Sequence, residues 1–309
     1  MALHGLGKVT VGVPNVHDTI AYYIDFGLEH RGNGVLATRN GGEQLHIVHA
    51  PTRRLVELTV AADDPDDIAA ITRRVHRLGV ALDEDGTSVR TVEPITGTIV
   101  RVAVRPRIVI EPAVLPTPYN GPGRIDRWGG PPRFSPAPSR CAPRKLGHAV
   151  IGSTDLKTTM KFFTDGLGFK VSDYMGDKAA FLRCSVEHHN VLVMAAPVNF
   201  MHHTSWQVDD IDEVGRGAHT MLENNPERHI WGLGRHYAGT NFFWYLKDPA
   251  GNFSEYYSDM DTVPEDELWS PEVLHGLQGL YAWGPPPPPS FLEPDDLAAL
   301  MTGAHSGTG

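Results

Sequence analysis

The stretch LGHAVIGSTDLKTTMKFFTDGLGFKVS at residues 146–172 decides the fold, because its pattern also occurs near the start of the chain. Residues 5–32 likewise run from Leu-Gly through a strand with alternating apolar residues, a turn, a helix with an aromatic pair and a closing glycine. The pair Tyr22-Tyr23 of the first copy corresponds to Phe162-Phe163 of the second. Such self-similarity indicates an internal repeat.

A second pair of segments shares another pattern. Residues 53–79 and 201–224 each contain a strand, an acidic turn that can cap a helix, and then a helix. Each leads to a pair of strands around a Pro/Gly turn, at 93–102 and at 248–257. The sequence therefore predicts an α+β fold with four βαβββ modules, two in each half, and with a sheet folded around a cavity in each half.

Pro- and Gly-rich stretches without periodicity mark the boundaries of the expected domains. We expect an N-terminal domain at 1–112, a linker at 113–144 and a C-terminal domain at 145–284. A proline-rich tail at 285–309 follows, in which a short helix is expected at 294–301.

Composition excludes several classes of function. A length of 309 residues fits about two domains, and a hydrophobic content of 41% suffices for a packed core. The net charge of −10 argues against nucleic acids and anionic membranes as partners. Only two cysteines occur, no apolar run reaches the roughly 18 residues of a membrane span, and the N-terminus does not resemble a signal peptide. We expect a soluble, cytoplasmic protein.

Two histidines and one glutamate of the second half suggest a metal centre. They are His148 in KLGHAVIGSTDL, His203 in MHHTSWQV and Glu255 in DPAGNFSEYYS. Two histidines and one carboxylate are the composition of the facial triad that holds a non-haem Fe(II) and leaves other positions open. His202 competes with His203, but neighbouring residues of a strand face opposite sides, so only one can face the cavity.

The first half provides an internal control. Aligning the repeats places three poor ligands for a divalent cation opposite the three candidates, in the same order: Lys8, Leu55 and, with a one-residue gap, Arg101. We therefore expect a metal site in the second half only.

With these four modules and ligands in one half, the chain resembles the vicinal oxygen chelate superfamily over residues 5–285. Within it, the chain is similar to the type I extradiol catecholic ring-cleavage dioxygenases, such as the 2,3-dihydroxybiphenyl and catechol 2,3-dioxygenases. The resemblance implies two tandem domains, each a mixed-sheet barrel around a cavity. It also implies metal ligands at His148, at His203 in the string H-x-x-aromatic-x-V, and at Glu255 after D-P-x-G. His202 would then face outward.

The resemblance also implies an activity. The chain would be an oxidoreductase that inserts both atoms of O2 into a catechol at a non-haem Fe(II), with Mn(II) also compatible with the ligands, and it would form a homo-oligomer. His189 would be the acid–base residue, although His188 is the competing neighbour, and His236 and Tyr245 would bind the catechol oxygens. Part of an aromatic set would form a pocket that excludes water: Trp206, Phe242, Phe243 and Trp244.

One departure affects the substrate. In several biphenyl-type enzymes a polar Asn-Asp pair follows the histidine that corresponds to His236, whereas this chain has Ala238 and Gly239. Two alternatives stay open. One is another metal-dependent enzyme of this superfamily, such as a glyoxalase or an epimerase, which typically has four protein ligands. The other is a non-catalytic binding protein of the same fold.

Overall fold

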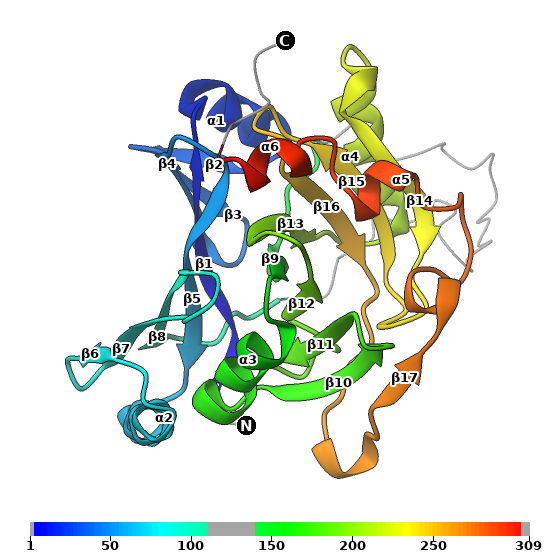
Figure 1. The fold of residues 1–309 in the computed structure, drawn as a ribbon. Helices are drawn as coiled ribbons and strands as arrows, with labels where there is room; N and C mark the ends of the chain where they lie inside the picture. Colours follow the sequence, from blue (N-terminus) through cyan, green and yellow to red (C-terminus); the bar gives the residue numbers. More distant parts are fainter. Residues whose placement is uncertain (1–2, 111–139, 304–309) are drawn as a thin grey trace, which may run out of the picture.

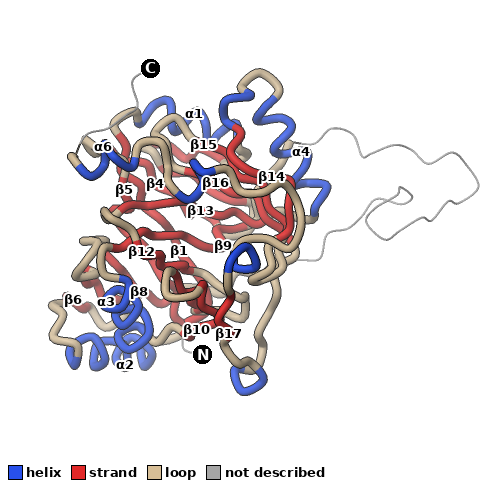
Figure 2. The backbone as a smooth tube through the Cα atoms, turned by 45° about the vertical axis from the view of Figure 1, so that its right-hand side comes forward, coloured by secondary structure: helices blue, strands red, loops and turns tan. Residues whose placement is uncertain are grey.

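Two mixed β-sheets, one from each half of the chain, form the frame of the protein in the computed structural model (Figures 1 and 2). The structure describes residues 3–110 and 140–303, so most of the expected linker at 113–144 lies outside the described residues. The first sheet has the order β2-β3-β4-β1-β5-β8-β7-β6. Its strands are β1 Leu3–Val13, β2 Glu29–Gly32, β3 Val35–Thr38, β4 Gly42–His49, β5 Arg54–Ala62, β6 Leu82–Glu84, β7 Ser88–Val92 and β8 Ile99–Val104.

The second sheet has the order β14-β15-β16-β13-β9-β12-β11-β10-β17. Its strands are β9 Lys145–Ser153, β10 Lys170–Met175, β11 Ala179–Arg183, β12 Val191–Ala195, β13 Phe200–Gln207, β14 His229–Arg235, β15 Phe242–Lys247, β16 Phe253–Ser258 and β17 Glu272–Leu274. In each half the first strand pairs in parallel with the last strand of its own module and antiparallel with the first strand of the next module. The predicted α+β fold of four βαβββ modules is confirmed.

The crossover helices begin at acidic caps, as predicted. The Asp64 carboxylate accepts hydrogen bonds from the amides of Asp66 and Asp67, and the Asp210 carboxylate accepts one from the amide of Glu213. The helices are α1 Val16–Asp25, α2 Pro65–Arg77, α3 Leu156–Lys161 with the π-helical η1 Phe162–Leu167, α4 Ile211–Leu222 with the 3-10 turn η2 Pro226–Arg228, η3 Asp266–Leu268, η4 Gly276–Gly279, α5 Pro289–Leu292 and α6 Leu297–Met301. No helix among the described residues is long and apolar enough to cross a bilayer.

The two halves share one hydrophobic core. Helix α1 of the first half packs on the second sheet, where the Phe26 and Tyr256 rings stack with their centroids 3.8 Å apart. The Trp206 ring meets that of Tyr23 edge-on at 6.3 Å. This face of β13 and β16 is therefore occupied by the first half, and the opposite face is available for a site.

The chain after β16 covers that opposite face. Strand β17 pairs in parallel with β10 at one edge of the second sheet, and Trp283 forms a bridge with Arg235 of β14 at the other edge. Helices α5 and α6 then cross the sheet toward the first half (Figure 1). There the buried side chains of Arg53 and Asp296 form a bidentate ion pair at 2.5 and 2.7 Å. The helix expected at 294–301 is observed at Leu297–Met301.

Candidate metal centre and active site

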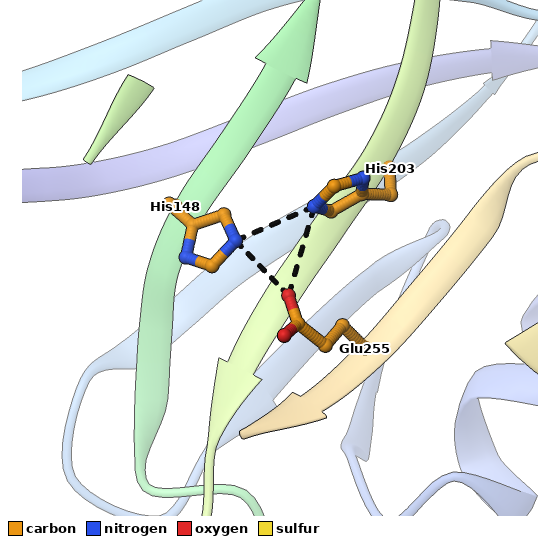
Figure 3. Close-up of side chains that lie close together, drawn as sticks. All are labelled: His148, His203 and Glu255. Carbon is orange, nitrogen blue, oxygen red and sulfur yellow. Dashed lines mark hydrogen bonds and ion pairs between the residues drawn. The ribbon is translucent and has the colours of Figure 1, made fainter. Parts of the chain in front are cut away.

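Three adjacent strands of the second sheet bring His148, His203 and Glu255 together (Figure 3). Strands β9, β13 and β16 are neighbours, and their register pairs His148 with Ser205 and Ser205 with Glu255. His203 lies two residues before Ser205 and therefore on the same face of β13. Residues from three distant parts of the sequence thus meet on one surface.

The donor atoms of these residues converge. The His148 Nε2 atom lies 3.0 Å from Glu255 Oε2 and 3.3 Å from His203 Nε2, and His203 Nε2 lies 3.6 Å from Glu255 Oε2. All three side chains are buried. Ligands at right angles on bonds of about 2.1 Å stand about 3 Å apart, so this spacing fits a divalent cation.

Unsatisfied polar atoms point to the same conclusion. Among the described residues, Glu255 Oε2 has no hydrogen-bond donor, although His148 Nε2 is 3.0 Å away. The contact lacks hydrogen-bond alignment, because both atoms point toward a shared centre (Figure 3). A buried carboxylate oxygen without a partner is costly, and a cation at this centre would satisfy it.

His202 sets the protonation pattern of His203. The Nε2–H group of His202 donates to the carbonyl oxygen of Phe291, and His202 Nδ1 lies 2.7 Å from His203 Nδ1. Burial lowers the pKa of His202 to about 4, so this imidazole is neutral and its Nδ1 atom accepts the proton of His203 Nδ1. His203 Nε2 then keeps its lone pair, which is the form that a metal ion requires.

The outward orientation predicted for His202 is wrong. The register of β13 against β9 shifts between Met201 and His203, so His202 is the extra residue of a β-bulge. A bulge breaks the strict alternation of strand side chains. His202 is buried and lines the same cavity as His203.

The second oxygen of Glu255 is held by protein groups. Glu255 Oε1 accepts a hydrogen bond of 3.2 Å from Asn241 Nδ2 and lies 3.6 Å from His236 Nε2. Burial by itself raises the carboxyl pKa, but His148, His236 and His203 hold the pKa of Glu255 well below its usual value. Asn241 was missed in the sequence, because one asparagine in a loop before a strand carries no signal of its role.

A cavity of about 630 Å³ opens beside these residues. His148 and His203 line it together with the three residues predicted to act on substrate and O2, His189, His236 and Tyr245. The His189 ring lies 4.3 Å from that of His148, and the Tyr245 ring lies 5.0 Å from that of His203, measured between centroids. One wall comes from the tail, through residues that include Phe291.

His236 and Tyr245 form a hydrogen-bonded pair. His236 Nδ1–H donates to the carbonyl oxygen of Leu280, and the Tyr245 hydroxyl lies 2.9 Å from His236 Nε2. The Tyr245 hydroxyl is the donor of this hydrogen bond when His236 Nε2 carries a lone pair. Burial and then the Glu255 carboxylate raise the pKa of Tyr245 well above its usual value. The phenol therefore remains protonated and can serve as a donor.

The aromatic pocket predicted from 206 and 242–244 is wrong. None of these four residues lines the cavity. Trp206 packs against the first half, and Phe243 is buried in a separate cluster with Trp231. The aromatic walls come from Phe181, Phe200 and Phe291 instead. Alternation along β13 and β15 did not predict these walls, because Phe181, Phe200 and Phe291 come from three separate elements, β11, β13 and α5.

The positions opposite the metal candidates can now be read from the register of the first sheet. Lys8 pairs with Thr59 and Thr59 pairs with Arg101, as His148 pairs with Ser205 and Ser205 with Glu255. The residue two before Thr59 is Glu57, so the expectation of Leu55 opposite His203 is wrong by two residues.

Comparisons with known proteins identify the family to which the chain belongs. The sequence profile of the Glyoxalase/Bleomycin resistance protein/Dioxygenase superfamily matches residues 145–256. Metapyrocatechase 2 of Cupriavidus necator is 30% identical over 73% of this chain and 71% of its own length. An iron-dependent extradiol dioxygenase of Rhodococcus jostii is 30% identical over 45% of this chain and 50% of its own.

A solved structure covers nearly the whole chain. The Mn(II)-bound glyoxalase of Novosphingobium aromaticivorans superposes with a TM-score of 0.75 at 25% identity, over 99% of this chain and 97% of its own. The shared fold and the extent of the match to metapyrocatechase 2 establish the family. This chain belongs to the extradiol dioxygenases of the Glyoxalase/Bleomycin resistance protein/Dioxygenase superfamily.

Proposed function

We propose that the protein cleaves the aromatic ring of a catechol beside its two hydroxyl groups, with insertion of both atoms of O2. The observation that carries this proposal is the convergence of His148 Nε2, His203 Nε2 and Glu255 Oε2 at a cavity that His189, His236 and Tyr245 also line. These three protein donors would hold Fe(II) or Mn(II), the metals in the names of the iron-dependent relative and the Mn(II)-bound structure. When bound, the ion would supply a Lewis acid for the catechol oxygens and a redox-active centre for O2.

The protein groups would orient the substrate and handle its protons. The Tyr245 hydroxyl and His236 Nε2 stand side by side next to Glu255, where they can hydrogen-bond one catechol oxygen and select the carbon that reacts. His189 lies on the His148 side of the cavity. Its imidazole would take up the proton of a substrate hydroxyl and return it later to the product. The apolar walls would exclude water during the reaction.

We propose an uncharged catechol with a bulky apolar substituent as substrate. The cavity volume of about 630 Å³ lies in the range for drug-sized ligands. Its walls include Phe181, Leu192 and Phe200, and Lys178, an exposed residue, is the only lysine or arginine of the described lining. A substrate carboxylate inside the cavity would therefore lack a buried cation to pair with.

A glyoxalase-type reaction is the second candidate, because the Mn(II)-bound glyoxalase aligns over nearly the full chain. Glyoxalases of this superfamily typically bind their metal through four protein ligands. The group of His, Cys, Asp and Glu donors that converges among the described residues has three members, which favours the dioxygenase.

The test is an activity panel with protein loaded anaerobically with Fe(II) or, separately, with Mn(II). We expect O2 uptake and a yellow ring-opened product, faster with bicyclic or alkyl catechols than with catechols bearing a carboxylate. Preference for the carboxylated catechols would overturn the substrate proposal alone. No O2 uptake with any catechol, together with isomerisation of a hemithioacetal, would replace the dioxygenase proposal by the glyoxalase one.

Three further proposals concern the whole protein. We propose a cytoplasmic location, supported by two cysteines, Cys141 and Cys184, that are both free thiols. We also propose a homo-oligomer, as the resemblance implies. The third is that the first domain, 1–112, is a scaffold and that the domain at 145–284 carries the reaction, because the candidate ligands all belong to the second sheet.

A further inference from the structure

A second pair of neighbouring histidines, His188 and His189, lies between β11 and β12. His189 lines the cavity, whereas His188 is fully buried behind it. The Asp173 Oδ2 atom of β10 lies 2.9 Å from His188 Nε2, and His188 Nδ1 lies 3.0 Å from His189 Nδ1. The three side chains thus form one hydrogen-bonded chain that ends at the cavity.

The chemistry of these groups fixes the direction of the hydrogen bonds. A carboxylate oxygen accepts hydrogen bonds, so the Asp173 contact places a proton on His188 Nε2. A neutral His188 then has a lone pair on Nδ1 and must accept the proton of His189 Nδ1. His189 Nε2 is left with a lone pair toward the cavity.

We propose that Asp173 and His188 are positioning residues that hold His189 in the Nδ1–H tautomer, so that its Nε2 atom meets the substrate as a base. The inference rests on the proposed function, since that function assigns the substrate proton to His189. After proton uptake at Nε2, the Asp173 carboxylate beyond His188 stabilises the positive charge, as a buried carboxylate does behind a catalytic histidine.

Packing on several sides holds this chain in place. The second oxygen of Asp173 accepts a hydrogen bond of 2.7 Å from the Glu272 amide of β17, so the chain after β16 orients the carboxylate. The Phe181 ring contacts both imidazoles, with centroids 5.6 and 5.1 Å away, and the Trp269 ring contacts His188 at 5.4 Å.

Gly239 packs against the His188 ring of this hydrogen-bonded chain. It has a φ of +75°, and a Cβ atom there would lie 3.1 Å from His188 Nδ1. The glycine that stands in place of the polar residue of biphenyl-type enzymes therefore makes room for the positioning histidine.

Matched variants of His188 test the inference in the metal-loaded enzyme. His188→Gln keeps an acceptor for the His189 Nδ1 proton, whereas His188→Leu has a similar size and no acceptor. We expect His188→Leu and Asp173→Asn to lower kcat at least about 100-fold, with metal content and KM for the catechol little changed, and His188→Gln to lose less than about tenfold. Equal activity of His188→Gln and His188→Leu, at any level, would overturn the proposal.

A spectroscopic measurement tests the tautomer without relying on activity. Imidazole 15N–1H correlation spectra of the Zn(II)-loaded protein would be recorded with 15N-labelled histidine, and the His189→Ala variant would assign the His189 signals. We expect a proton on Nδ1 and none on Nε2. A proton on Nε2 would refute the inference even if catechols are cleaved. The expected tautomer in a protein that cleaves no catechol would leave the positioning role standing and refute the proposed function.

Discussion

The two sheets have the same backbone arrangement but differ in the side chains at matching positions. In the first sheet the register against β1 shifts between Leu55 and Glu57, and in the second it shifts in the same way between Met201 and His203. A second shift lies between Leu6 and Lys8 in one half, and between Leu146 and His148 in the other. Both halves therefore present three side chains on one face at matching places.

The matching side chains have opposite chemistry. The second half has two imidazoles and one carboxylate, all buried, whereas the first half has Lys8, Glu57 and Arg101, of which Arg101 is exposed. Two cations beside one carboxylate repel a divalent metal ion. The fold therefore provides three positions where a metal site can form in either half. The identity and the burial of the residues at these positions decide whether a site forms.

The largest effect is expected from removing one donor. His203→Ala should weaken metal binding by more than the 10–100-fold typical of an outer-shell partner, and activity should fall below detection. The matched control is Glu57→Ala at the corresponding place in the first sheet, which should keep metal and activity. Metal content by elemental analysis and O2 uptake check both variants. If the His203→Ala protein bound stoichiometric metal and remained active, His203 would not be a ligand and the contrast between the two halves would be wrong.

The cover over the second sheet provides the next test. Asp296→Asn should leave the buried Arg53 guanidinium without its counter-charge, at a cost of about 3–5 kcal/mol in the free energy of unfolding. Because this ion pair joins the tail to the first half, protease cleavage within the tail should also become faster.

The neighbouring Asp295 is a matched control for that variant. Its carboxylate is 77% exposed and lies 3.9 Å from Lys247, so Asp295→Asn should change stability by less than about 1 kcal/mol. Chemical denaturation measures the free energy of unfolding of both variants. Equal stability of the two variants would show that the buried pair does not hold the tail in place.

The smallest effect on activity is expected from transferring the ligands. The triple variant Lys8→His, Glu57→His, Arg101→Glu places the triad on the frame of the first half. We expect one additional Mn(II) to bind, more weakly than at the native site, because Arg101 lies in an exposed position where water competes. Dioxygenase activity should not increase, since no counterpart of the tail covers this face among the described residues. Calorimetric titration measures the stoichiometry, and a gain in turnover would show that the cover is dispensable.

The candidate metal centre was predictable from sequence because its three residues stand in local patterns. The internal repeat defines which strands correspond, and His148, His203 and Glu255 each stand in a distinctive context. Adjacent β9, β13 and β16 follow from the module order, and strand periodicity then directs the side chains to one face. The acidic helix caps were predictable for the same reason, because each cap residue bonds an amide two or three residues later in the chain.

The errors arose where periodicity fails. The bulge at His202 adds one residue to β13, so strict alternation wrongly predicted that His202 faces outward. The first-half position opposite His203 was predicted at Leu55 instead of Glu57 because the two strands share little sequence and only the sheet register aligns them. Neither β5 nor β13 has a glycine or proline at its bulge, so the composition of these strands did not predict the bulge.

The sequence by itself determined the four-module α+β fold and the three candidate metal ligands, because repeats and strand patterns are properties of short segments. The candidates His189, His236 and Tyr245 followed from the resemblance to the extradiol dioxygenases. Only the tertiary structure decided what surrounds them. The Asp173–His188–His189 chain, the amide of Asn241 on Glu255 and the tail wall at Phe291 join residues distant in the chain. Such contacts arise from packing between elements, which no local pattern encodes.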